Sequence, residues 1–200
     1  GIPVPVIGNN KACAWGFTNS MVDDVDFFIE KTHPENPNQY LQGNEWKNME
    51  IVSETIPLKK GKDTTVVVRL THHGPVISDI HPLLKGKGTA ISMAWTGHEL
   101  TNEMNAFMKL NTMKNWNDFT EAVKNFGVPG QNIIYADTAG NIGWRPAVYV
   151  PIRKEGNSLM PRPGHKESYD WHGYVPFEKM PYIFNPEKGF GFIIGDDGKD

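Results

Sequence analysis

A chain of 200 residues, 38% of them hydrophobic and 22% charged, has the composition of an ordinary globular domain. The formal net charge of −3 at pH 7 argues against nucleic acid as the main partner, because phosphate binding requires a clustered basic surface. The sequence contains a single cysteine, Cys13, and no apolar run of about 18 residues. It therefore predicts neither a disulfide within the chain nor a membrane span.

The first half of the chain is predicted to consist of turns and strands. Residues 14–19 (AWGFTN) show neither helical nor strand periodicity and are interpreted as a tight apolar turn. The β-branched runs at 51–58 and 64–71 flank a turn that contains Gly61, which predicts a β-hairpin. A further strand is expected over 89–96.

After this strand the hydrophobic period becomes that of a helix. A short helix is predicted over 102–110 and a second over 115–126, with Asn115 as its expected N-cap. The stretch 132–146 is expected to form two strands joined by a turn. Residues 150–190 are rich in proline and glycine, which predicts mostly loop.

These elements predict one α+β domain over residues 1–200, with helices packed against a mainly antiparallel sheet. The strands at 64–71, 89–96 and 132–144 are expected to be neighbours in that sheet. The helix over 115–126 is expected to pack on them through one apolar face. That face consists of Trp116, Phe119, Val123 and Phe126.

Three acidic residues follow the predicted turn. Asp23 and Asp26 are three positions apart, so a turn could direct both carboxylates and a backbone carbonyl to one calcium ion. The spacing does not fit an EF-hand loop, which needs acidic residues at alternate positions and a central glycine. A solvated acidic turn, or a helix N-terminus, explains the same residues without a metal.

Other reactive side chains do not form a recognisable catalytic set. His72 and His73 are adjacent, so within a strand they would point to opposite faces and would not share one ion. A structural role for one of them, bonded to a backbone carbonyl, is favoured over zinc. Cys13 lies in an apolar run without an activating cation, which predicts a buried, inert thiol. The sequence has no G-x-S-x-G elbow and no G-x-G-x-x-G turn between strand and helix.

Six stretches, taken in order, resemble the penicillin acylase (penicillin amidase) family. They are VPVIGNNKACAWGFTNSMVDDVDFFIE (4–30), QYLQGNEWKNMEIVSETIPLKKG (39–61), HGPVI (73–77), IIYADTAGNIGW (133–144), LMPRPG (159–164) and YDWHGYVPFEKMPYIFNPEKGF (169–190). Their number and order carry the resemblance. It implies an N-terminal nucleophile hydrolase with an αββα-type sandwich, of which this chain is a central fragment of the β-subunit.

In that family a serine freed by self-cleavage begins the β-subunit and uses its own α-amino group as base. The position of this serine lies upstream of Gly1, so the nucleophile is absent from the chain. The family's side-chain oxyanion donor, an asparagine, is absent as well. Residues 191–200 (GFIIGDDGKD) depart from the family pattern where it should occur and are a candidate non-native end. The implied partners are the remainder of the β-subunit and the α-subunit of the same precursor.

The resemblance also implies site residues. The backbone N–H of Asn19 corresponds to the family's oxyanion donor. The structural calcium site of the family corresponds to the carboxylates of Asp23 and Asp26, the carbonyl of Val25 and, less directly, Ser158. Phe17, Gln131 and Ile133 are candidates for the acyl pocket, with simple core packing as the alternative for each. No organic cofactor is implied.

The implied activity is hydrolysis of a non-peptide amide between a hydrophobic acyl group and an amine, of the kind used in antibiotic metabolism. The fragment alone is expected to be inactive, and a periplasmic or secreted location is implied by the resemblance only. The alternative is a non-catalytic relative or binding module that keeps the scaffold without the nucleophile.

Overall fold

The computed structural model describes residues 4–189, which form two compact units. The first unit contains residues 4–24, 99–151 and 174–189, and the second contains 25–98 and 152–173. The candidate non-native end, 191–200, lies outside the described residues. Among the described helices, none has the length and apolar character needed to cross a membrane.

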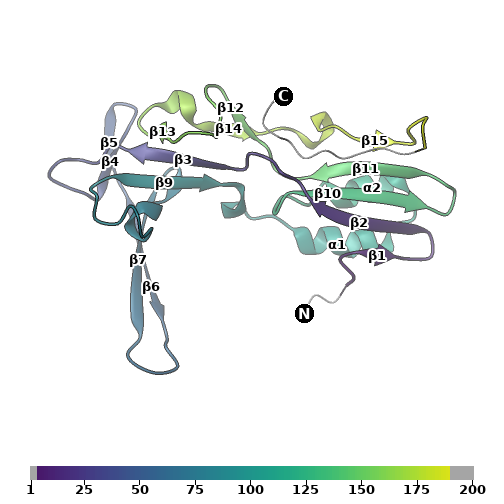
Figure 1. Ribbon diagram of the computed structural model, residues 1–200, viewed down its shortest axis with the longest axis horizontal. Coiled ribbons are helices and arrows are strands. Elements are labelled where there is room, and N and C mark those ends of the chain that lie inside the picture. The colour runs from purple at the N-terminus through teal and green to yellow at the C-terminus, as the bar shows by residue number, and fades with distance from the viewer. Residues whose placement is uncertain (1–3, 190–200) are drawn as a thin grey trace. The chain divides into compact units, whose positions relative to one another are not determined.

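The first unit is built on a sheet with the strand order β1-β2-β10-β11-β15 in the described part of the chain (Figure 1). All four strand pairs are antiparallel. The strands are β1 (Gly8–Asn9), β2 (Cys13–Asn19), β10 (Gln131–Asp137), β11 (Ile142–Ala147) and β15 (Ile183–Phe184). The helices of this unit are α1 (Glu103–Thr112), α2 (Trp116–Val123) and the 3₁₀ helix η4 (Phe177–Lys179).

The helices predicted over 102–110 and 115–126 are confirmed as α1 and α2. The side chain of Asn115 accepts a hydrogen bond of 3.0 Å from the backbone N–H of Asp118, as an N-cap does. Phe119 and Val123, four residues apart on one helical face, are both fully buried. The amphipathic pattern of this short segment therefore identified the face that enters the core.

The core of the first unit joins both helices to the sheet. Burying this apolar surface is the main favourable term for the fold, at about 25 cal/mol per Å². The cluster comprises Cys13, Trp15, Ala106, Leu110, Met113, Phe119, Ala122, Val123, Phe126, Ile133, Tyr135 and Ala147.

The predicted apolar turn at residues 14–19 is wrong, because this stretch belongs to strand β2. Its side chains alternate between buried positions, at Cys13 and Trp15, and an exposed position at Ala14. Strand β10 pairs with the whole of β2, from Cys13 opposite Asp137 to Asn19 opposite Gln131. A partner about 120 residues later in the chain supplies the hydrogen bonds that hold this short, glycine-containing segment extended.

The second unit contains several small sheets. The three-stranded orders are β13-β3-β9 and β6-β7-β8, and β4 pairs with β5 and β12 with β14. The strands are β3 (Val25–Glu30), β4 (Gln39–Gln42), β5 (Glu45–Asn48), β6 (Glu50–Ile56), β7 (Thr64–Thr71), β8 (Gly74–Pro75), β9 (Ala90–Trp95), β12 (Pro151–Arg153), β13 (Arg162–Pro163) and β14 (Trp171–Tyr174). The 3₁₀ helices are η1 (Ile77–Asp79), η2 (Thr96–His98) and η3 (Glu167–Tyr169).

The predicted hairpin is confirmed as β6 and β7, and the predicted strand at 89–96 as β9. The prediction that 64–71, 89–96 and 132–144 are neighbouring strands is wrong. Strand β7 pairs with β6 and β8, β9 pairs with β3, and β10 lies in the sheet of the first unit. Side-chain alternation shows that a segment is a strand and which face is apolar, but it does not encode the partner strand.

Candidate functional site

The backbone of Asn19 ends strand β2, and the hydrogen-bond pattern of the sheet determines where its N–H points. At one end of the β2–β10 ladder, the N–H of Ser20 donates to the carbonyl of Gly130 at 3.0 Å. At the other end of the ladder, the N–H of Thr138 donates to the carbonyl of Ala12, also at 3.0 Å. Hydrogen-bonded and non-hydrogen-bonded pairs alternate along an antiparallel ladder. Asn19 and Gln131 are therefore a non-hydrogen-bonded pair, and the N–H of Asn19 points away from β10.

On that side of β2 the neighbouring strand is β1, which pairs only with Ala14 and Trp15. The N–H of Asn19 thus lies beyond the region of β2 that β1 covers. The backbone of Asn19 is also held by a side chain, because its carbonyl accepts a hydrogen bond of 3.2 Å from the amide of Asn132. The Asn132 amide oxygen in turn accepts a bond of 3.0 Å from the indole N–H of Trp144. The side chains of Asn132 and Trp144 thus support the end of this strand, a role that no sequence motif indicated.

The three candidate pocket residues lie close to Asn19 in the same sheet. The side-chain amide of Gln131 donates to Oδ1 of Asn19 at 3.2 Å. Phe17 is partly buried and meets the ring of Phe107 edge to face, with ring centroids 5.7 Å apart. Ile133 is fully buried within the core cluster. This burial favours core packing for Ile133, whereas Phe17 and Gln131 keep partly exposed surfaces.

The candidate calcium ligands are divided between the two units. Asp23 belongs to the first unit, whereas Val25, Asp26 and Ser158 belong to the second. Asp26 is buried, and its Oδ2 accepts hydrogen bonds from Arg153 Nε at 2.7 Å and Trp171 Nε1 at 2.5 Å. The carboxylate therefore already has a cationic partner within the second unit.

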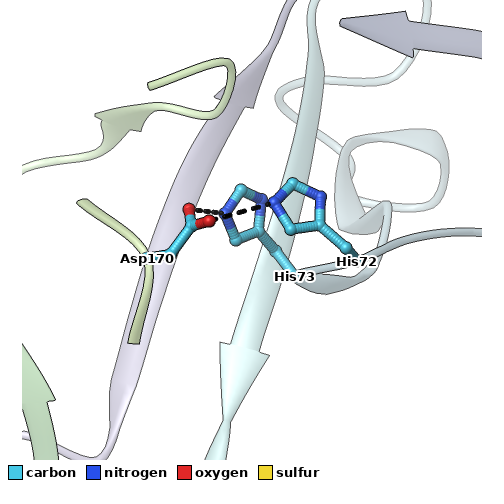
Figure 2. Close-up of side chains that lie close together, drawn as sticks. All are labelled: His72, His73 and Asp170. Carbon is cyan, nitrogen blue, oxygen red and sulfur yellow. Dashed lines mark hydrogen bonds and ion pairs between the residues drawn. The ribbon is translucent and has the colours of Figure 1, made fainter. Parts of the chain in front are cut away.

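A second group of functional side chains lies in the second unit around His73. Its Nδ1 lies 2.9 Å from Glu30 Oε1, and its Nε2 lies 2.9 Å from Asp170 Oδ1. The neighbouring His72 approaches the same aspartate, with Nε2 at 3.6 Å from Oδ2. Figure 2 shows both imidazole rings directed toward Asp170. We call His72, His73, Asp170 and Glu30 the histidine–carboxylate cluster.

Glu30 is the most deeply buried member of this cluster, and its side chain has no exposed surface. Its Oε1 also accepts hydrogen bonds from the hydroxyls of Thr71 at 2.9 Å and Ser92 at 2.5 Å. Gly164 packs against the carboxylate so closely that a Cβ at this position would overlap it. The buried carboxylate thus joins β3, the end of β7 and β9, and it requires glycine at 164.

Hydrogen bonding outweighs burial in the pKa values of Glu30 and His73. Burial opposes the charged form of Glu30, but hydrogen bonds from His73 and Ser92 lower its pKa below the ordinary 4.5. Burial likewise opposes an imidazolium at His73, yet hydrogen bonds to Asp170 and Glu30 raise its pKa above 6.5. Burial lowers the pKa of His72, and the charge of His73 lowers it further. These pKa shifts favour ionised carboxylates at Glu30 and Asp170, the charged form of His73 and the neutral form of His72.

The expectation that His72 and His73 point to opposite faces of a strand is wrong. Strand β7 ends at Thr71, and the two histidines lie in the turn before Gly74. Gly74 has a φ of 130°, and a Cβ there would overlap the carbonyl of Met93, so only glycine allows this turn. The turn brings the two rings to a centroid separation of 3.8 Å. His73 also bonds to carboxylates rather than to the backbone carbonyl that was expected.

Cys13 is buried as predicted. Its nearest polar partner is the hydroxyl of Tyr135, 3.8 Å from Sγ. Burial raises the pKa of the thiol above its ordinary 9.0, so the reactive thiolate is disfavoured. Cys13 is therefore a core residue.

Comparison with known proteins places these observations in a family. The penicillin amidase family model matches residues 1–194. The chain belongs to the penicillin amidase family. It is 34% identical to penicillin G acylase of Escherichia coli over 94% of this chain and 22% of that protein. It is 29% identical to an acyl-homoserine lactone acylase, QuiP, of Pseudomonas fluorescens over 95% of this chain and 24% of that protein.

The fold agrees with this assignment. A thermostable penicillin G acylase from Alcaligenes faecalis superposes with a TM-score of 0.84 at 28% sequence identity, covering 99% of this chain and 36% of that one. The predicted fold class, a strand-rich N-terminal nucleophile hydrolase with packed helices, is confirmed. The chain spans about a quarter of the length of the curated relatives it matches. The relatives named by these comparisons are acylase-type amidohydrolases.

Proposed function

We propose that the chain is part of an enzyme that hydrolyses an amide between a hydrophobic acyl group and an amine, through an N-terminal serine that lies outside this chain. The membership in the penicillin amidase family supports this proposal. The relatives are named for two kinds of acyl substrate, penicillin G and acyl-homoserine lactones. The remainder of the β-subunit and an α-subunit would complete the site, and one relative is named as a proenzyme. A periplasmic or secreted location is part of the same proposal.

The orientation of the Asn19 N–H is the observation that carries the proposal. An oxyanion hole needs a backbone donor that is held rigidly and is not already used within a sheet. Asn19 meets both conditions, because the β2–β10 ladder does not use its N–H and Asn132 holds its carbonyl. The aromatic ring of Phe17, two residues earlier in β2, is available to contact an apolar acyl group.

Replacing Asn19 with proline tests this role, because proline removes the N–H without removing a β2–β10 hydrogen bond. Loss of one oxyanion donor is expected to lower kcat by about 10²–10³-fold. The intact protein would be assayed with penicillin G, an acyl-homoserine lactone and a phenylacetyl amide reporter. Asn19→Ala keeps the backbone donor and is the matched control.

Equal turnover by Asn19→Pro and Asn19→Ala, in proteins with similar melting curves, would exclude this donor role. The 200-residue chain alone is expected to show no turnover, because the proposal places the nucleophilic serine outside it. An intact protein without turnover on any of the three substrates would favour the non-catalytic scaffold instead.

We also propose a structural calcium ion in the intact enzyme, bound by Asp23, Asp26, the carbonyl of Val25 and Ser158. Oxygen donors of these types suit calcium. Asp26 fits the role of a calcium ligand because it is a buried carboxylate with two oxygens. Arg153 and Trp171 contact Oδ2, and Oδ1 is the second oxygen. The Arg153 guanidinium already neutralises part of this charge, so further acidic ligands from other segments would be needed.

Asp26→Asn should lower the melting temperature of the intact protein both with and without calcium, because it also weakens the pair with Arg153. The diagnostic quantity is the increase in melting temperature that calcium causes, which should shrink in Asp26→Asn. Calcium that binds only the folded state at a hundredfold excess over Kd contributes about 2.7 kcal/mol. Asp24→Asn is the control and should retain the full calcium effect. An equal calcium effect in both variants would rule out Asp26 as a ligand.

A further inference from the structure

Three metal-ligating side chains converge at the end of β7 in the second unit. The ligand atoms of His72, His73 and Asp170 all lie within 4.8 Å of one another. Asp170 presents one oxygen to each ring, at 2.9 Å from His73 Nε2 and 3.6 Å from His72 Nε2. In a tetrahedral zinc site, bonds of about 2.0–2.1 Å place neighbouring donor atoms about 3.3 Å apart. The two observed separations, each to a different oxygen of Asp170, lie on either side of this value, so the three side chains are within the range of one shared ion.

The surrounding residues hold both rings in place. The ring of His73 stacks on Phe28 with centroids 3.6 Å apart and an angle of 4° between the planes. The ring of His72 stacks on Tyr40 at 5.5 Å, and the backbone N–H of His72 donates to the Tyr40 hydroxyl at 3.1 Å. These contacts orient the two Nε2 atoms before any ion binds, which reduces the ordering that binding would require.

Glu30 contacts the ring nitrogen of His73 that would not bind the metal, an arrangement typical of metal-binding histidines. Such histidines commonly donate their other ring N–H to a carboxylate, which fixes the tautomer and increases the basicity of the ligand nitrogen. Glu30 accepts at Nδ1 of His73, so Nε2 is the nitrogen that faces Asp170 and His72. Glu30 is thus a positioning residue and not itself a ligand.

The cluster is also partly open to solvent. The side chains of His72 and Asp170 are each 23% exposed, which leaves an open side for a water molecule as fourth ligand.

We propose that His72 Nε2, His73 Nε2 and the Asp170 carboxylate bind one divalent transition-metal ion of the zinc class, with Glu30 positioning His73. Two imidazoles and one carboxylate suit zinc and its neighbours, whereas calcium requires oxygen ligands. Binding breaks the Nε2–H bond of His73, forms the metal–nitrogen bond and releases one proton to solvent. The ion joins the end of β7 to the segment before β14. The proposal does not depend on the amidase function.

Cobalt(II) titration of the intact protein tests the site, since cobalt(II) with nitrogen ligands absorbs visible light. The protein is first freed of transition metals and kept in excess calcium, so that any calcium site stays filled. One equivalent of cobalt is expected to bind, and zinc is expected to displace it. His72→Gln should weaken binding at least about tenfold, since it removes a ligand. His172→Gln, which changes an exposed histidine two residues from Asp170, should bind like the parent.

Melting curves without metal establish whether each variant folds, and Asp170→Asn provides a second ligand variant if His72→Gln does not. A folded parent that binds no stoichiometric cobalt would overturn the proposal. So would a folded His72→Gln or Asp170→Asn variant that binds cobalt as tightly as the parent. In either case the cluster is a hydrogen-bonded contact centred on His73 that binds no metal ion.

Discussion

Replacing Glu30 with alanine should lower the free energy of unfolding by about 3–5 kcal/mol, the cost typical of removing one partner from a buried ion pair. The Glu30 carboxylate is fully buried and accepts hydrogen bonds from His73, Thr71 and Ser92. Without it, a buried imidazolium and two hydroxyls lose their acceptor. The measurement is urea unfolding near pH 6 with transition metals removed, and Glu54→Ala is the control. Glu54 is exposed on β6, so its replacement should change stability by no more than about 0.5 kcal/mol.

The pH dependence of unfolding provides a second measurement of the same contact. The pKa of His73 is raised, so the contribution of His73 to stability is complete below pH 6.5 and is lost as the pH rises through the raised pKa. The pKa values of Glu30 and Asp170 are lowered. Their contributions to stability are therefore complete above pH 4.5 for Glu30 and above pH 3.8 for Asp170, and are lost as the pH falls through the lowered pKa values. The cluster should therefore stabilise most between about pH 5 and 6.5. His72, whose pKa is lowered, opposes folding slightly as the pH falls below 6.5.

The difference in unfolding free energy between the parent and Glu30→Ala should follow this pH profile, whereas Glu54→Ala should track the parent. A Glu30→Ala variant as stable as Glu54→Ala across the range would show that the cluster does not contribute to stability.

Replacing Phe119 with alanine should cost about 3–5 kcal/mol, because it leaves a cavity in the core of the first unit. Phe119 is fully buried on α2, and its ring lies 5.0 Å from that of Trp116 and 5.1 Å from that of Tyr135. These contacts join the helix to β10, so the surrounding structure can close the cavity only in part. Urea unfolding followed by tryptophan fluorescence would measure the loss.

Met108→Ala is the matched control for this cavity, because it truncates a large side chain that is 54% exposed on α1. Its effect should be well under 1 kcal/mol. An unchanged unfolding midpoint for Phe119→Ala would mean that the apolar face of α2 does not pack on the sheet.

Local signals in the sequence predicted the elements whose stability is largely local. The N-cap at Asn115 and the spacing of Phe119 and Val123 were sufficient for α2, because capping and helical periodicity operate within a few residues. The hairpin of β6 and β7 was predicted for the same reason, since a short turn joins its strands. The six ordered stretches also predicted the family, which the family model then confirmed.

The candidate site was predicted in part. The resemblance named Asn19 for its backbone N–H, but a single sequence does not show which way an N–H points in a sheet. That direction depends on the register with β10, more than 100 residues away in the chain. The acidic residues Asp23 and Asp26 were identified, but the pairing of Asp26 with Arg153, 127 residues later, was not.

The histidine–carboxylate cluster shows most clearly what the tertiary structure decided. His73 is 43 residues from Glu30 and 97 residues from Asp170 in the chain, and no spacing rule connects such positions. The sequence by itself determined the helices, the hairpin and the buried faces, because propensity, capping and periodicity depend on neighbouring residues. It also determined the family, through the six ordered stretches. Only the tertiary structure decided which strands pair, where the Asn19 N–H points and which charges meet around His73. Those contacts join distant segments, and each forms only when the burial of apolar surface outweighs the conformational entropy lost in bringing those segments together.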